Sequence, residues 1–156
     1  MEYRKNDIVT LEIVDCGTDG EGIGKADGFT VFVKDAVIGD TVTAKIMKAK
    51  KNYGYGRLME ILNASPYRVE PVCPSARQCG GCQLQAVSYE EQKVFKEKKL
   101  RGHLERIGGF TNLPMEPLIG MDEPYHYRNK AQFPVGRNKE GKIVHWFLCW
   151  TYTRYY

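Results

Sequence analysis

The chain has 156 residues, of which 42% are hydrophobic and 27% are charged, a balance typical of a globular rather than a disordered protein. The formal net charge of +4 is a mild basic excess, which is compatible with a nucleic-acid partner. No apolar run reaches the roughly 18 residues that a membrane-spanning helix needs, and residues 1–7 lack the apolar core of a signal peptide. We therefore expect a cytoplasmic protein without a membrane partner.

Residues 7–62 have the pattern of a small β-protein. Runs rich in β-branched and aromatic residues alternate with glycines at short intervals. Several short strands with glycine-rich turns predict a small β-barrel over residues 1–62. The alternative for the glycines between residues 17 and 28 is a phosphate-binding loop. It is excluded because neither a Gly-Lys-Ser/Thr sequence nor a helical pattern follows them.

The rest of the chain has a mixed α and β pattern. The proline-marked residues 63–72 predict a linker. A capping box that starts at Ser88, together with the glycines at positions 108 and 109, predicts a helix over residues 88–107. Short strands are expected around residues 132–135 and 142–144. The expected fold class is a β-rich N-terminal barrel followed by an α+β region with a cysteine loop and one long helix. The chain is too short to hold a full Rossmann-like domain in addition to these parts.

Three of the five cysteines, Cys73, Cys79 and Cys82, lie close together, and Gly80-Gly81 supplies the sharp turn that lets neighbouring thiolates reach one metal centre. Iron–sulfur clusters usually take four thiolates, and runs of this kind often supply three of them. Zinc accepts thiolates too, but a second cysteine pair or a histidine pair would then be expected, and none is present. The spacing favours an iron–sulfur cluster over zinc, with unrelated thiols as the third alternative.

The stretch between residues 45 and 57 carries five cations and no acid, with Tyr53 and Tyr55 among them. Phosphates bind cations and bases stack on aromatic rings, so this stretch is a candidate RNA surface. A solvated hairpin turn explains the charges about equally well. The candidate RNA-binding residues are Lys45, Lys48, Lys50, Lys51, Tyr53 and Arg57, with Arg128, Asn129 and Lys130 of a short downstream block.

Over residues 1–144 these features together resemble the bacterial RNA uracil-5-methyltransferases, which modify uridine in 23S ribosomal RNA or in transfer RNA. The most specific matching motif is Cys73-Pro74-x4-Cys79-Gly80-Gly81-Cys82-x-Leu84-Gln85, followed by Tyr89-x-x-Gln92-x-x-x-Lys96 and by Tyr127-Arg128-Asn129-Lys130. The resemblance implies a TRAM-like barrel and a [4Fe–4S] cluster on Cys73, Cys79 and Cys82, with a fourth cysteine further downstream. It also implies that the barrel and the central region bind RNA, and ribosomal RNA is favoured over transfer RNA.

The family enzymes also carry a C-terminal Rossmann-like domain, which binds S-adenosylmethionine and holds a cysteine nucleophile and a carboxylate base. No such domain is expected here. The resemblance therefore implies a monomeric RNA- and cluster-binding portion of an enzyme, inactive alone, in which residues 73–144 begin the central domain. Residues 145–156 lack family likeness, and our hypothesis for this tail is a frameshift; its Cys149 is not expected to be the fourth ligand. A self-sufficient RNA-binding module and a zinc-stabilised structural protein stay open as alternatives.

Overall fold

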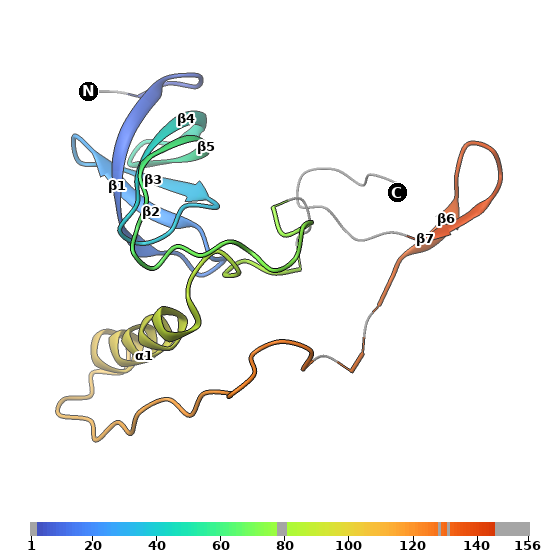
Figure 1. Cartoon of the computed structure of the whole chain (residues 1–156). Coiled ribbons are helices and arrows are strands. Elements are labelled where there is room, and N and C mark those ends of the chain that lie inside the picture. Colours follow the sequence, from blue (N-terminus) through green and yellow to red (C-terminus); the bar gives the residue numbers. More distant parts are fainter. Residues whose placement is uncertain (1–2, 78–80, 128, 131, 146–156) are drawn as a thin grey trace. The chain divides into compact units, whose positions relative to one another are not determined.

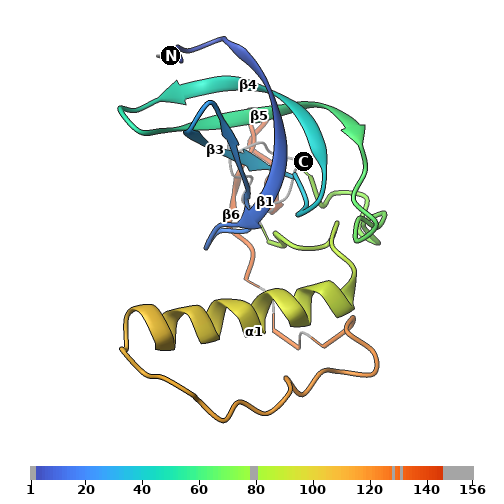
Figure 2. The ribbon, with the colours of Figure 1, turned by 90° about the vertical axis from the view of Figure 1, so that its left-hand side faces the viewer.

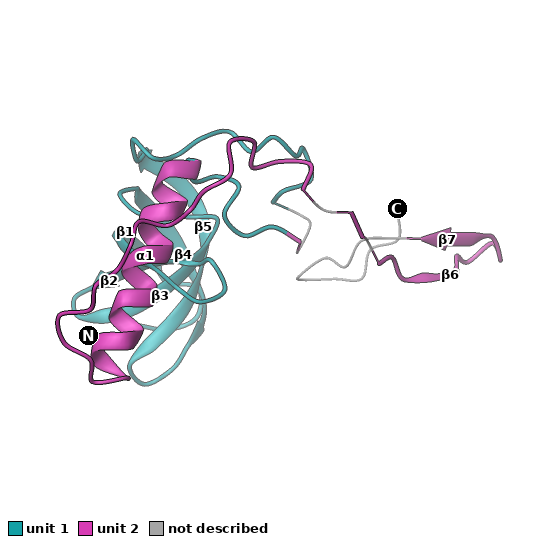
Figure 3. Ribbon diagram, turned by 90° about the horizontal axis from the view of Figure 1, so that it is seen from below, with its two compact units in different colours: residues 1–77, 82–88 teal, residues 78–81, 89–156 magenta. Residues whose placement is uncertain are grey.

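The computed structural model describes residues 3–77, 81–127, 129–130 and 132–145. Its elements (Figure 1) are β1 (Ile8–Cys16), β2 (Gly22–Ala26), β3 (Phe29–Lys34), β4 (Thr41–Ala49), β5 (Tyr53–Asn63), α1 (Tyr89–Arg106), β6 (Val135–Arg137) and β7 (Ile143–His145). The chain divides into two compact units, residues 1–77 with 82–88 and residues 78–81 with 89–156, which Figure 3 shows in different colours. We call them the barrel unit and the helix unit.

The first five strands close into a barrel in the order β1-β2-β3-β5-β4, which confirms the predicted small barrel. All neighbouring pairs are antiparallel except β3 and β5, which run parallel. Figure 2 shows β4 and β5 as long neighbouring strands. Alternate residues face the interior, because successive side chains of a strand point to opposite faces. The fully buried side chains include Leu11, Ile13, Val31, Val33, Val42 and Ile46.

The sequence Tyr53-Gly54-Tyr55-Gly56 shows why two glycines occupy one strand. Both glycines are buried, while both tyrosines are exposed. A Cβ atom on Gly54 would lie 2.9 Å from the carbonyl oxygen of Lys48 and 3.0 Å from the ring of Phe29. There is thus no room for a side chain on the inner side of β5 at these positions. Over residues 53–56, β5 packs its backbone against the core and carries large side chains only on the outside.

A buried ion pair fastens the chain that follows β5 to the barrel. The Asp40 side chain is fully buried, and its Oδ2 accepts a hydrogen bond from the Val37 amide (2.7 Å). Its Oδ1 accepts hydrogen bonds from the Ser65 amide (2.9 Å) and from Nε of Arg68 (3.1 Å). Nη2 of Arg68 forms an ion pair with Oδ2 of Asp40 and donates to the carbonyl oxygen of Asp35 (2.8 Å). We call this arrangement the Asp40–Arg68 clasp.

Two short segments, residues 65–69 and 84–88, run side by side and close the cysteine loop between them. Arg68 and Val87 form an antiparallel bridge. The Val69 amide donates to the carbonyl oxygen of Ala86 (3.0 Å), and the Ser88 amide donates to that of Tyr67 (2.8 Å). We call the paired segments the stem. Several residues of the 63–72 stretch, where the sequence predicts a linker, are therefore bound to the barrel unit.

In the helix unit, α1 spans residues 89–106, close to the predicted 88–107, and none of its residues is buried. Gly109 follows with a φ of +69°, a conformation that glycine adopts readily and that ends helices. The strands β6 and β7 form a hairpin. The first of them begins at Val135, later than predicted, after Pro134, which lacks an amide donor for a strand ladder.

As predicted, the described part of the chain contains no Rossmann-like domain, since its one parallel strand pair belongs to the barrel. Among the same residues, no helix is both long enough and apolar enough to cross a membrane.

Candidate nucleic-acid interface

The outer surface of β3 and β5 carries three aromatic rings in mutual contact. Phe32 on β3 is the register partner of Tyr55 on β5, and their ring centroids lie 5.6 Å apart with an interplanar angle of 32°. The Tyr53 ring stands nearly perpendicular to both, at 85° to Phe32 and 81° to Tyr55, with centroid distances of 5.8 and 5.9 Å. We call these rings the aromatic cluster.

The aromatic cluster is open to solvent although its rings are large. Tyr53 is 37% exposed and Tyr55 is 42% exposed. The pKa of Tyr55 is raised, first by partial desolvation and then by Tyr53 and the carboxylates of Glu21 and Asp19. The raised pKa keeps Tyr55 neutral at physiological pH, so its aromatic face carries no negative charge.

Two residues further along β3 and β5, on the same outer surface, three cations lie side by side on neighbouring strands. Lys34 on β3 is the partner of Arg57 on β5, which is in turn the partner of Lys45 on β4. Residues in such cross-strand pairs have Cβ atoms about 4.5–5.5 Å apart, and like charges in this position are destabilising. None of the ion pairs in the described ranges includes these three side chains. We call them the cation row, a surface that bound anions would stabilise.

The structure brings together part of the predicted RNA surface. Lys45, Tyr53 and Arg57 belong to the cation row and the aromatic cluster, and Lys48 is the register partner of Tyr55. Lys50 and Lys51 are exposed at the turn between β4 and β5. Asn129 and Lys130 are exposed residues of the helix unit, and Arg128 lies outside the described residues.

Sequence reasoning did not select Phe32, Tyr55 and Lys34 for the site. Phe32 and Lys34 lie outside the basic stretch and enter the surface through the parallel pairing of β3 with β5. Tyr55 offered a signal, because tyrosines at positions 53 and 55 of one strand must face the same side.

Two of the three clustered cysteines lie in the described ranges. Cys73 is half-buried, Cys82 is exposed, and both are free thiols. The Cys73 amide donates a hydrogen bond to Oε1 of Gln85 (3.2 Å) across the base of the loop. Cys79 and Cys149 lie outside the described residues. Within the described residues, no group of three or more His, Cys, Asp or Glu side chains could hold a metal ion. Two free thiols on opposite arms of one closed loop suit a thiolate-binding metal centre.

Comparison with known proteins gives the chain a context. Residues 4–59 match the model of the TRAM domain. A protein of Halalkalibacterium halodurans named "Uncharacterized RNA methyltransferase" is 48% identical over 141 residues, which cover 90% of this chain and 31% of the relative. Proteins with the same description from Clostridium acetobutylicum and Clostridium tetani are 49% and 47% identical, cover 92% of this chain, and have 32% and 31% of their own length covered.

This chain thus spans about a third of the length of the relatives it matches, and their names bear out the resemblance to RNA methyltransferases. Among solved structures, the solution structure of a conserved protein of Methanococcus maripaludis is 28% identical. The match covers 37% of this chain and 83% of that one, with a TM-score of 0.35.

Proposed function

Because residues 4–59 are a TRAM domain in a chain similar to RNA methyltransferases, we propose that this protein binds RNA through the outer face of β3, β5 and β4. The observation that carries the proposal is the position of the aromatic cluster directly beside the cation row. Cations neutralise the phosphate backbone, and aromatic side chains stack on bases.

The same arrangement favours a single strand over a duplex. Bases inside a duplex are already stacked on each other, so their faces are not available to Tyr53 or Tyr55. Unpaired bases can lie against exposed rings while their phosphates contact a neighbouring row of cations. The substrate class is therefore single-stranded RNA or the unpaired part of a folded RNA.

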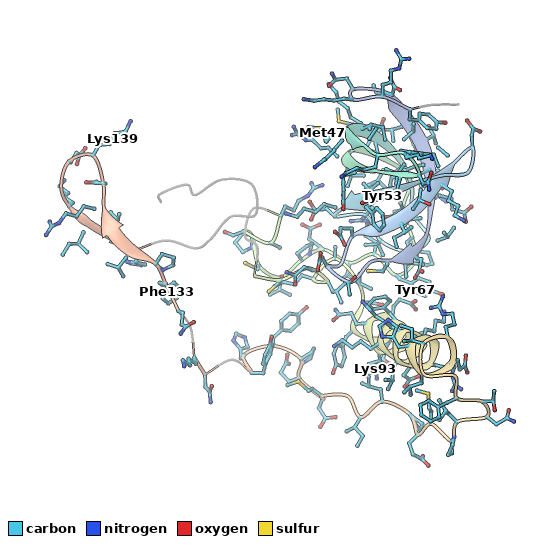
Figure 4. All side chains as sticks on the ribbon, turned by 180° about the vertical axis from the view of Figure 1, so that it is seen from behind. Met47, Tyr53, Tyr67, Lys93, Phe133 and Lys139 are labelled. Atoms are coloured by element: carbon cyan, nitrogen blue, oxygen red, sulfur yellow. The ribbon has the colours of Figure 1, made fainter. Side chains whose placement is uncertain are left out.

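The first test removes one ring of the aromatic cluster. Tyr53→Ala should weaken the binding of a single-stranded RNA by about 1–3 kcal/mol, or roughly 5- to 150-fold, if the ring stacks on a base. Fluorescence anisotropy with a labelled oligonucleotide measures the affinity. Tyr67→Ala is the matched control, since Tyr67 is 43% exposed in the same unit but away from Tyr53 (Figure 4). No loss in Tyr53→Ala, or an equal loss in both variants, would contradict stacking at this position.

For a protein of the relatives' full length, we infer a finer function: S-adenosylmethionine-dependent methylation of uridine at C5, in ribosomal rather than transfer RNA. The names of the relatives support the methylation of RNA. The motifs around Cys73–Cys82 and Tyr127–Lys130, which resemble those of the RNA uracil-5-methyltransferases, support the finer assignment. In this assignment the residues described here hold the RNA, and the methyl donor binds elsewhere in the longer protein. Identification of the methylated base after incubation of a full-length relative with RNA and S-adenosylmethionine tests it.

We also propose that Cys73, Cys79 and Cys82 hold an iron–sulfur cluster, on the support of their spacing and of the two free thiols on opposite arms of the loop. When bound, the cluster would cross-link the loop, because metal binding and the folding of such loops are coupled. The stem hydrogen bonds close the base of this loop.

The second test concerns these thiolates. After anaerobic reconstitution, Cys82→Ser should retain much less iron than the wild-type chain, because a hydroxyl replaces a thiolate ligand. Cys16→Ser is the control, since it makes the same substitution at a cysteine that lies at the end of β1 and outside the cysteine loop. Elemental analysis for iron and zinc gives the result. Equal iron in both variants, or zinc in place of iron, would refute the cluster assignment.

A further inference from the structure

We infer that the cysteine loop supplies a fourth cation, Arg77, to the phosphate path of bound RNA. A single strand would then run from the β4–β5 hairpin across Lys45, Arg57 and Lys34 and continue onto the loop. The inference rests on the proposed RNA binding. It extends the RNA-binding surface beyond the TRAM domain, which spans residues 4–59.

The contact that carries the inference joins the end of the cation row to the loop. Nζ of Lys34 donates a hydrogen bond to the carbonyl oxygen of Arg77 at 3.5 Å. Lys34 is the last residue of β3 and the last cation of the row on that side. Arg77 itself is exposed, and none of the ion pairs within the described ranges includes it.

The loop is fixed to the barrel at three places, so this contact does not depend on one hydrogen bond. The Asp40–Arg68 clasp holds the first arm of the stem, and the stem hydrogen bonds hold the second. At the far side, Gln83 packs against Gly20, where a Cβ atom would stand only 2.4 Å from the Cβ of Gln83. Gly20 has a φ of +85°, so glycine serves there both for the turn and for the close approach of the loop.

Acidic residues border the cation row on the side of β2. Glu21 directly precedes Gly22, which pairs with Val33, so Glu21 lies at the level of Lys34 on the β2 side. The carboxylates of Glu21 and Asp19 are also near enough to raise the pKa of Tyr55. Negative charges at this border repel phosphates, so a strand that leaves Lys34 is directed away from β2 and towards Arg77.

The experiment measures how the RNA affinity of the whole chain, after anaerobic reconstitution with iron, depends on salt. The probe is a labelled single-stranded RNA of about 12 nucleotides, a length within the range that small nucleic-acid-binding barrels bind. Loss of one phosphate contact lowers the slope of log K against log salt by about 0.7 for single strands. Arg77→Gln should therefore lower the slope by this amount and weaken binding about 5-fold at about 0.1 M salt. Arg77→Lys should retain most of the wild-type slope, because the charge remains.

Two further variants complete the design. Glu21→Gln should bind RNA more tightly than wild type, because it removes a border charge. Lys139→Gln loses the same charge as Arg77→Gln but lies in the turn between β6 and β7 of the helix unit, so it should match wild type.

The outcomes separate this inference from the function it rests on. A wild-type slope in Arg77→Gln, with a lowered slope in variants of the cation row, would overturn the path over the loop and leave RNA binding by the barrel intact. Wild-type slopes in all of these variants would overturn both. Equal losses in Arg77→Gln and Lys139→Gln would also overturn the inference, because net charge alone would then explain the effect.

Discussion

Arg68→Ala is expected to lower the free energy of unfolding of the barrel unit by about 3–5 kcal/mol. The substitution leaves the Asp40 carboxylate, which is fully buried, with only the amides of Val37 and Ser65 as hydrogen-bond donors. Removing one partner of a buried ion pair is costly because the remaining charge has no water to solvate it. The Arg68 side chain is 19% exposed, which places the expected loss in the lower half of that range.

Urea unfolding followed by circular dichroism measures this loss. Arg57→Ala is the matched control, since it removes the same side chain from the same unit at an exposed position without an ion pair in the described residues. Its stability should change by less than about 0.5 kcal/mol. Replacing Asp40 by Asn and Arg68 by Met together removes both charges but keeps only one of the two oxygens that accept from Val37 and Ser65, so it should recover only part of the stability. Equal losses in Arg68→Ala and Arg57→Ala would show that the clasp contributes little.

The dependence of stability on acidic pH gives an independent measure of the contribution of the Asp40–Arg68 clasp. Burial by itself would raise the pKa of Asp40, but hydrogen bonds from Arg68, Ser65 and Val37 outweigh burial and lower it. A carboxyl group whose pKa is lowered on folding contributes stability above its unfolded pKa of about 3.9, and that stability is lost as the pH falls through the folded value. The wild-type chain should therefore lose stability below about pH 4, and Asp40→Asn should lack this part of the loss.

The largest effect on binding is expected from the cation row. Replacing Lys34, Lys45 and Arg57 by Gln together should weaken the binding of single-stranded RNA about 100-fold at about 0.1 M salt, because three phosphate contacts each contribute about 0.7 to the salt slope. Stability should not fall, since the substitutions remove like charges that face each other on neighbouring strands. Fluorescence anisotropy measures the affinity, and urea unfolding confirms that the variant is folded.

The control for this variant changes the net charge equally elsewhere. Lys96, Lys98 and Lys139 are exposed cations of the helix unit, and replacing all three by Gln gives the same formal charge change. The affinity of this control for RNA should remain within a few-fold of wild type. A similar loss in both triple variants would indicate non-specific attraction by net charge.

The barrel could be predicted from the sequence because its signals are local. Alternation of apolar residues, such as Val9, Leu11 and Ile13, shows in each strand which side faces the core, and glycines mark the turns. The helix was predictable for the same reason, since a capping box and a glycine pair stand at its two ends. In each case the residues that set the structure lie within a few positions of one another.

The complete interface could not be predicted, because it depends on pairing between distant parts of the chain. Phe32 and Lys34 lie more than twenty residues before their partners Tyr55 and Arg57, and the parallel pairing of β3 with β5 leaves no mark on a local pattern. Arg68 is a similar case. In sequence it is one charge in a proline-marked stretch, and its role depends on Asp40, 28 residues earlier.

The most direct test of RNA binding by this face is the slope of log K against log salt for single-stranded RNA, measured between about 50 and 200 mM salt. We predict that replacing Lys34, Lys45 and Arg57 by Gln lowers the wild-type slope by about 2, whereas the matched triple variant of the helix unit keeps the wild-type slope. An unchanged slope in the variant of the cation row would contradict the account, because it would mean that no phosphate contacts this face.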